Sequence, residues 1–149
     1  MSVDVVIPNY NGFELVKENL PKVIEEAKRY GGSIIIVDDG SNKDEFESLS
    51  NFVKDKNILL LRNERNSGFS SAVNRGMSKS NSDFVVLLNT DVLPEDNFLD
   101  AAIKDLLSDG NLFGLGFMDK SVEDGKTILR GRGLAKWEKG FLVHRRGEV

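Results

Sequence analysis

The sequence predicts an α/β fold in which a mostly parallel β-sheet carries helices on both faces. Two observations predict it: short apolar runs end in polar, turn-forming residues, and the longer segments between them have the apolar spacing of helices. Strands that alternate with helices form βαβ units, and their right-handed crossovers place helices on both faces of the sheet. The alternation ends near Asp119, after which we expect some antiparallel strands towards the C-terminus.

The expected strands are runs rich in Val, Ile and Leu, and the expected helices repeat apolar residues along one face. The strands cover residues 3–7, 34–38, 58–61, 84–88 and 112–117. The helices cover residues 13–30, 44–54, 68–79 and 96–108. Ser41, followed three residues later by Asp44, resembles a capping box and predicts the start of the second helix.

Beyond Asp119 the pattern changes to turn residues and short extended segments. Residues 123–126 are a turn signal, and residues 127–134 and 141–146 are expected to form antiparallel strands. Residues 126–149 hold seven Lys and Arg against two Glu, in a chain whose net charge is −4. We expect this basic segment to form a solvated strand pair with its Lys and Arg side chains on the outer face, without a nucleic-acid partner. Contact with phosphates or with an anionic membrane surface stays open.

Length and composition indicate one globular domain over residues 1–149. A chain of 149 residues can bury one core, and 40% hydrophobic with 30% charged residues argues against disorder. The absence of cysteine excludes disulfides, a thiolate nucleophile and a cysteine zinc site. No apolar run reaches the ~20 residues of a membrane span, and the N-terminus lacks a basic signal-peptide region. We therefore expect a cytoplasmic protein, with peripheral contact at the inner face of the membrane left open.

Polar residues gather where the expected strands end. In an open α/β sheet, ligands bind outside the carboxyl ends of the strands, near the point where the strand order reverses. Four polar stretches follow strands, at residues 8–12, 38–41, 63–68 and 89–91. Each stretch alone is weak evidence because ordinary turns also need Gly, Asn and Asp. Their convergence on one edge predicts a binding site.

Three of these stretches offer groups that suit a nucleotide. Asp38 and Asp39 can accept hydrogen bonds from a base N–H or a ribose hydroxyl; alternatively, they are acids that complement a helix dipole. Tyr10 can stack on a base, or it packs half-exposed against the protein. Asn66 and Gly68 open a helix whose N–H groups can bind a pyrophosphate, or they form an ordinary turn.

The fourth stretch contains Asp91, just past an apolar strand. A carboxylate exposed there suits a hard divalent cation, because Mg²⁺ prefers one or two carboxylates together with substrate phosphates. The alternative is a strand-end cap. His144, the only histidine, has no partner motif and is expected to be structural. The chain has no P-loop sequence and no G-x-G-x-x-G after a strand, which argues against the corresponding nucleotide-binding folds.

Taken together, these motifs resemble those of the family 2 glycosyltransferases. Residues 5–11 look like the family's opening strand and P-x-Y-N turn, and residues 37–41 match its V-D-D-G-S signature. Residues 66–76 are similar to its N-x-G-x-x-x-A-x-N-x-G helix start, and residues 87–91 look like its D-x-D element. The resemblance is clear over residues 3–110 and implies the GT-A fold, a Rossmann-like α/β sheet.

The resemblance also implies roles for individual residues. Pro8, Tyr10 and Asp39 would line the base pocket, and Asn89 and Asp91 would face the ribose and a metal-bound diphosphate. The divalent cation would be Mn²⁺ or Mg²⁺. The expected nucleotide-sugar site consists of Pro8, Tyr10, Asp38, Asp39, Asn66, Gly68, Asn74, Arg75 and Asn89, with Asp91 as the metal ligand.

By resemblance, the expected activity is inverting, metal-dependent transfer of a sugar from a nucleoside diphosphate sugar to a saccharide or lipid-linked acceptor. Asp39 can accept the imino proton of uracil, thymine or guanine, so we expect the donor to carry uridine, thymidine or guanosine diphosphate. The motif variants look most like transferases of bacterial surface polysaccharide, rhamnosyl transferases among them. A departing diphosphate gains charge that a divalent cation stabilises.

Two departures from the family's pattern qualify this expectation. Asn89 stands where the D-x-D element has its first acid, and no stretch matches the later acidic motif that carries the family's catalytic base. The catalytic residue is therefore unassigned, and we expect the acceptor-binding half to be missing. A module that binds nucleotide sugars without turnover is the alternative. A sugar nucleotidyltransferase is disfavoured because residues 9–13 lack its Gly-rich basic loop.

Overall fold

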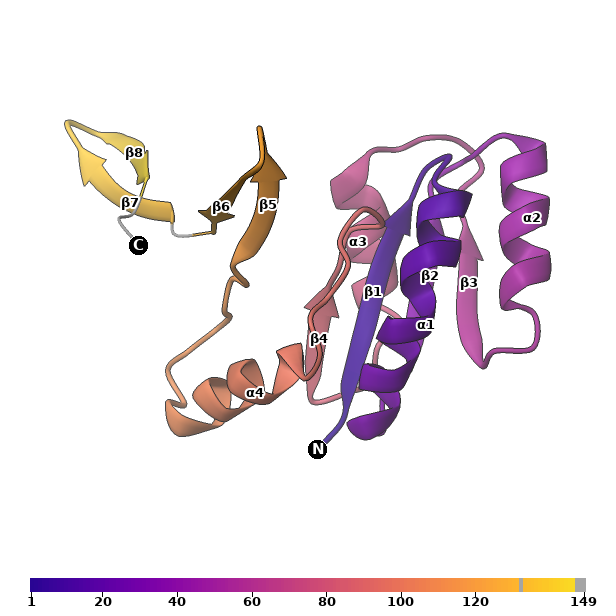
Figure 1. Cartoon of the computed structure of the whole chain (residues 1–149), viewed down its shortest axis with the longest axis horizontal. Helices are drawn as coiled ribbons and strands as arrows, with labels where there is room; N and C mark the ends of the chain where they lie inside the picture. Colours follow the sequence, from indigo (N-terminus) through magenta and orange to yellow (C-terminus); the bar gives the residue numbers. More distant parts are fainter. Residues whose placement is uncertain (132, 147–149) are drawn as a thin grey trace. The chain divides into compact units, whose positions relative to one another are not determined.

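The computed structural model describes residues 1–131 and 133–146 (Figure 1). The chain divides into two compact units, the N-terminal unit Met1–Asn97 and the C-terminal unit Phe98–Val149. Over the described residues, no helix is both long enough and apolar enough to cross a bilayer.

The N-terminal unit is built on four parallel strands. They are β1 (Val3–Asn9), β2 (Ile34–Asp38), β3 (Ile58–Arg62) and β4 (Phe84–Leu87), in the order β3-β2-β1-β4. The chain adds strands on one side of β1 up to β3 and then crosses to place β4 on the other side. The strand order therefore reverses between β1 and β4, which is where open α/β sheets bind ligands.

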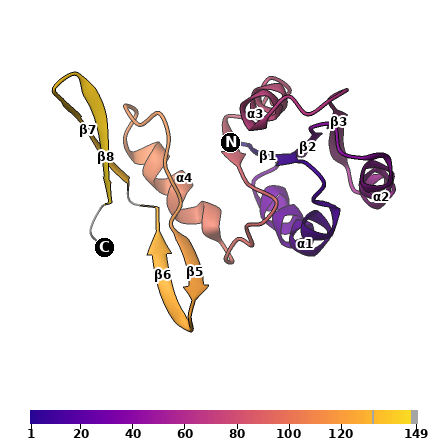
Figure 2. The same ribbon diagram turned by 90° about the horizontal axis from the view of Figure 1, so that it is seen from above.

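Three helices cover this sheet. They are α1 (Phe13–Arg29), α2 (Lys43–Val53) and α3 (Phe69–Met77). Figure 2 shows α1 and α2 on one face of the sheet and α3 on the other. The predicted parallel sheet with helices on both faces is confirmed.

The core forms where β1 and β2 are covered on both faces. On the α3 side, Val6, Ile35 and Val37 pack with Ala72 of α3, and all four are buried. Gly76 lets α3 approach closely, because a Cβ there would lie 2.5 Å from Cγ1 of Val6. Burial on both faces explains why residues 5–7 of β1 and 34–37 of β2 are continuous apolar runs rather than alternating ones.

The described residues of the C-terminal unit form one helix and two hairpins. They are α4 (Phe98–Ser108), the hairpin of β5 (Asp119–Glu123) with β6 (Lys126–Arg130), and the hairpin of β7 (Gly133–Glu138) with β8 (Phe141–Arg146). Asp124 and Gly125 have φ of 50° and 73°, the backbone that a tight hairpin turn needs. The predicted turn and antiparallel strands are confirmed, although the expected segment 127–134 is divided between β6 and β7.

Two local predictions were wrong. Residues 112–117 form no strand, and Phe113 is fully exposed; Gly114 and Gly116 interrupt this run, and glycine is a weak strand former. Asn42, not Ser41, caps α2: its Oδ1 accepts from the N–H of Glu45 at 3.0 Å. The hydroxyl oxygen of Ser41 instead accepts from the N–H of Asn11.

Candidate functional site

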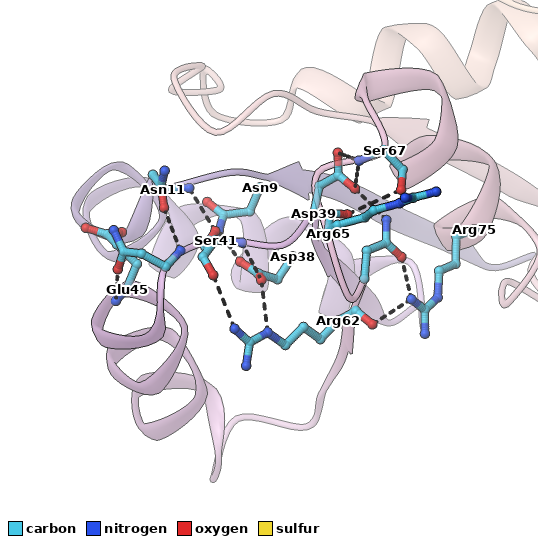
Figure 3. Close-up of polar contacts among 12 residues, drawn as sticks. Asn9, Asn11, Asp38, Asp39, Ser41, Glu45, Arg62, Arg65, Ser67 and Arg75 are labelled. Carbon is cyan, nitrogen blue, oxygen red and sulfur yellow. Dashed lines mark hydrogen bonds and ion pairs between the residues drawn. The ribbon is translucent and has the colours of Figure 1, made fainter.

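The loops that follow the four parallel strands lie at the carboxyl edge of the N-terminal unit. Figure 3 shows the polar contacts among the loops after β1, β2 and β3. Pro8, near the end of β1, is half-buried, and Tyr10 in the loop after β1 is 54% exposed, so the Tyr10 ring is free to be covered by a ligand. Asn11 joins this loop to the next one, because its Oδ1 accepts from the N–H of Asn42 at 3.0 Å.

Asp38, the last residue of β2, is completely buried. One carboxylate oxygen accepts from Nδ2 of Asn9 at 3.1 Å, and the other accepts from the N–H of Ser41 at 3.1 Å. Nε of Arg62 lies 3.8 Å from the second oxygen. Asp38 therefore ties the ends of β1, β2 and β3 together. Its predicted contact with a donor stays a prediction.

Asp39 is 4% exposed, and its carboxylate binds the start of α3. Its Oδ2 accepts from the N–H of Gly68 at 2.8 Å and from the N–H of Ser67 at 3.1 Å. Its Oδ1 accepts from the same Ser67 N–H at 3.1 Å and from Nδ2 of Asn63 at 2.6 Å. An ionised carboxylate has about four lone-pair positions. The protein itself therefore fills the acceptor capacity of Asp39 in this conformation.

These contacts set the charge state of Asp39. Burial raises the pKa of its carboxyl group, and hydrogen bonds from Asn63, Ser67 and Gly68 lower it. The hydrogen bonds win, and the pKa lies below its ordinary value. Asp39 is thus an anion at neutral pH, and it occupies the position at a helix N-terminus that favours negative charge.

Asn63 and Arg75 support Asp39 from the side of β3. Asn63 is buried, and while its Nδ2 donates to Asp39, its Oδ1 accepts from Nη1 of Arg75. The same Arg75 nitrogen donates to the carbonyl oxygen of Arg62 at 2.6 Å. Asn74 is exposed beside it on α3. Arg75 thus reaches the predicted site through Asn63.

The loops after β2 and β3 are in direct contact. Gly40 has φ of 75°, and a Cβ there would lie 2.4 Å from the carbonyl carbon of Arg65. No other residue fits without moving the backbone. At Gly68, φ is 89° and the space around the Cα is open. Asn66 is exposed, and its Oδ1 accepts from the N–H of Gly68 at 3.1 Å.

The loop after β4 carries the predicted metal ligand. Asn89 and Asp91 are exposed in a turn that the N–H of Val92 closes on the carbonyl oxygen of Asn89 at 3.3 Å. Nδ2 of Asn19 on α1 holds this loop through the carbonyl oxygen of Thr90 at 2.9 Å. Within residues 1–131 and 133–146, no three His, Cys, Asp or Glu residues gather as a metal cluster. One exposed carboxylate fits a cation that takes most of its ligands from substrate phosphates and water.

One acceptor near the strand reversal lacks a hydrogen-bond partner. Oδ1 of Asn9 is buried without a partner, while Nδ2 of the same amide is fixed by Asp38. Gly12 lies beside it, since a Cβ on Gly12 would be 2.8 Å from this oxygen and 3.6 Å from Oγ1 of Thr90. A small cavity also lies between α1 and the loop after β4, lined mostly by apolar side chains such as Val16 and Leu20.

The structure thus brings Asp38, Asp39, Gly68 and Arg75 into one connected group, and it places Asn89 and Asp91 on a separate loop of the same edge. Sequence reasoning did not foresee Asn63 as the residue that joins this group. The signal available was its position directly after β3, equivalent to Asp39 after β2. The side chain of His144 lies outside the described part of the chain.

The fold defines an α/β protein of the GT-A type. The sequence profile of the family described as Glycosyl transferase family 2 matches residues 4–146, and the chain belongs to this family. The predicted family is confirmed.

Curated relatives are much longer than this chain. An uncharacterized glycosyltransferase of Rickettsia bellii (strain RML369-C) is 28% identical over 126 residues, which are 85% of this chain and 18% of that protein. Hyaluronan synthase of Pasteurella multocida is 24% identical over 139 residues, 90% of this chain and 14% of the synthase. The chain therefore spans less than a fifth of the length of these two relatives.

Solved structures share the fold. The mannosyltransferase PcManGT from Pyrobaculum calidifontis, in complex with GDP-Man and Mn²⁺, superimposes with a TM-score of 0.63 at 24% identity, over 76% of this chain and 33% of that one. TarS 1-349 of S. aureus in complex with UDP gives a TM-score of 0.61 at 20% identity, over 72% and 32%. The predicted GT-A fold is confirmed by these likenesses.

Proposed function

We propose that this chain forms the donor-binding part of an inverting, metal-dependent glycosyltransferase. It would bind a nucleoside diphosphate sugar, and the sugar would pass to a saccharide or lipid-linked acceptor. The observation that supports this most directly is the arrangement of the four polar loops at the carboxyl edge of the parallel sheet, around the reversal between β1 and β4. Family membership supports the same reaction class.

The cation would be Mn²⁺ or Mg²⁺, and Asp91 would hold it. The exposed carboxylate of Asp91 can bind a cation, while the neutral amide of Asn89 is available for a ribose hydroxyl. The cation would stabilise the charge that develops on the diphosphate as it leaves. The solved relative PcManGT contains Mn²⁺ together with GDP-Man, which agrees with this proposal.

The base would lie over the loops after β1 and β2. Tyr10 has the exposed ring needed for stacking, and Pro8 borders the same loop. A base with an imino proton, as in uracil, thymine or guanine, would be preferred if Asp39 accepts that proton. Because the acceptor positions of Asp39 are filled, such a contact requires an N–H of Ser67 or Gly68, or the amide of Asn63, to give way.

A second candidate function is binding without turnover. Inverting transfer needs a base within ~2.6–3.2 Å of the acceptor hydroxyl or one water away. The carboxylate oxygens of Asp38 and Asp39 accept hydrogen bonds from the protein itself. A metal-bound Asp91 would be a poor base because the cation stabilises its ionised form. We therefore expect residues 1–149 alone to bind donor and to transfer sugar slowly or not at all.

A donor screen tests the proposal. Calorimetry with the diphosphates of uridine, thymidine, guanosine, cytidine and adenosine, with and without Mn²⁺, should show metal-dependent binding of at least one of the first three. No binding by any of them would contradict the proposal. A transfer assay with the matched donor separates the two functions, because turnover at about 1 s⁻¹ or faster would place the catalytic base inside this chain. Glu123 and Asp124 would then be substituted first.

A further inference from the structure

We propose that Asn63 is a positioning residue of the donor site: it holds the Asp39 carboxylate against the start of α3 and thereby fixes the loop between β3 and α3. This inference rests on the proposed function for its consequence in donor binding, whereas the contacts that carry it belong to the protein alone. None of the motifs in the sequence assigns a role to Asn63.

Both the nitrogen and the oxygen of the Asn63 side-chain amide make hydrogen bonds. Its Nδ2 donates to Oδ1 of Asp39 at 2.6 Å, and its Oδ1 accepts from Nη1 of Arg75. This leaves only one orientation for the amide, because a flipped amide would place Nδ2 against Arg75 and Oδ1 against the carboxylate. Asn63 therefore joins the cation of Arg75 on α3 to the Asp39 carboxylate, directly after β2.

The Asp39 carboxylate in turn decides where the loop lies. It accepts from the backbone N–H groups of Ser67 and Gly68, directly before α3 begins at Phe69. Gly68, the N-cap residue, has no side chain to cap the helix. Asp39, directly after β2, thus pairs the N–H of the N-cap residue and of the residue before it, as the acid of a capping box pairs an N-cap N–H. Without Asn63 on its other oxygen, the carboxylate could rotate away from these N–H groups.

The charges around Asn63 and Asp39 favour a test in which the amide and the carboxylate swap positions. Asp38, Arg62, Glu64, Arg65 and Arg75 are the charged groups nearest in sequence and contact, and Arg62 is already engaged by Asp38 and by the carbonyl oxygen of Ser41. Arg75, by contrast, meets a neutral amide oxygen. A carboxylate at position 63 would therefore face a guanidinium, provided that position 39 supplies a donor.

A reciprocal exchange tests the proposal. Asn63→Asp alone places two carboxylates in contact, and Asp39→Asn alone leaves a side-chain N–H facing either another N–H or the Arg75 cation. The double variant Asp39→Asn with Asn63→Asp restores a partner for each side-chain group: Nδ2 of residue 39 donates to the carboxylate at position 63, and Oδ1 of residue 39 accepts from Ser67 and Gly68. The second contact of the Ser67 N–H is lost. The net charge is that of the wild type. Asn51→Asp on the exposed side of α2 and Asp55→Asn in the following turn are the matched controls.

The first measurement is amide hydrogen exchange, which needs no ligand. In each single variant, the peptide covering residues 63–68 should exchange at least about fivefold faster, the effect of leaving one buried hydrogen-bonding group unpaired. The double variant should exchange within about twofold of the wild type. Unchanged exchange in both single variants, or a double variant as fast as or faster than either, would overturn the proposal. A double variant that fails to fold would do the same.

The second measurement is the Kd of the nucleoside diphosphate that the wild type binds with Mn²⁺. The single variants should raise the Kd at least about fivefold, and the double variant should bind at least about threefold more tightly than either single variant. Faster exchange with an unchanged Kd would show that Asn63 serves stability alone and would overturn its role in the donor site. If the wild type binds no nucleotide, the proposed function fails, and the exchange data still decide whether Asn63 holds Asp39.

Discussion

Asp91→Asn is expected to weaken Mn²⁺-dependent binding of a nucleoside diphosphate by about tenfold or more, or ~1.4 kcal/mol. Two features of the structure set this magnitude. Asp91 is exposed, so water screens its attraction for the cation. Among the described residues, no three His, Cys, Asp or Glu residues gather as a metal cluster. The substitution would therefore remove the charged ligand proposed for the cation and leave an amide oxygen, while screening by water limits the loss.

The assay is calorimetric titration of the diphosphate at several Mn²⁺ concentrations. Asn89→Ala should have a smaller effect on metal dependence, because a neutral amide contributes little charge to a cation site. Asp55→Asn, an exposed acid in the turn after α2, controls for the loss of one negative charge. Identical Mn²⁺ dependence in the wild type and Asp91→Asn would refute the assignment of the metal to this loop.

Three further outcomes are expected. Calorimetry should show that Asp39→Ala abolishes a preference for uridine, thymidine or guanosine diphosphate over the cytidine and adenosine diphosphates; tight adenosine diphosphate binding by the wild type would contradict this. Gly76→Ala should overpack Val6 and lower stability by about 1 kcal/mol after its gain in helix propensity, whereas Gly110→Ala, with open space around it, should not. Burial raises the pKa of the carboxyl groups of Asp4 and Asp39, but hydrogen bonds lower both pKa values below 3.8. The donors to Asp4 are Ser80 and Ser33. The donors to Asp39 are Asn63, Ser67 and Gly68. The contribution of both carboxylates to stability is therefore present above about pH 4 and lost as the pH falls through these lowered pKa values; Asp39→Asn should show a shallower loss in acid denaturation.

The sheet was predictable because its strands are buried on both faces. A run such as residues 34–37 is apolar at every position, which identifies a central parallel strand without knowledge of its neighbours. The run at residues 112–117 looks similar in its apolar content, but two glycines lie within it. Whether such a run becomes a strand depends on a partner edge being present, and the sequence of the run itself carries no record of that partner.

The candidate site at the carboxyl edge of the sheet was predictable in its location but not in its contacts. Polar residues after parallel strands must meet at the carboxyl edge, and this follows from topology alone. Which of them bind ligand and which bind one another depends on distances that spacing does not encode. Ser41 illustrates the point: its hydroxyl has the position of a cap, yet Asn42 caps α2 and Ser41 holds Asn11 instead.

Asp39 shows how two predictions drawn from separate motifs compete for the same atoms. The acid was expected to accept from a base, and the N–H groups before α3 were expected to bind a pyrophosphate. In the structure the Asp39 carboxylate and the N–H groups of Ser67 and Gly68 bind each other. A buried anion is costly when left unpaired, so a ligand-free protein pairs it with these N–H groups. A donor that uses either partner must release the other, and donor binding would then be coupled to the loop that Asn63 holds.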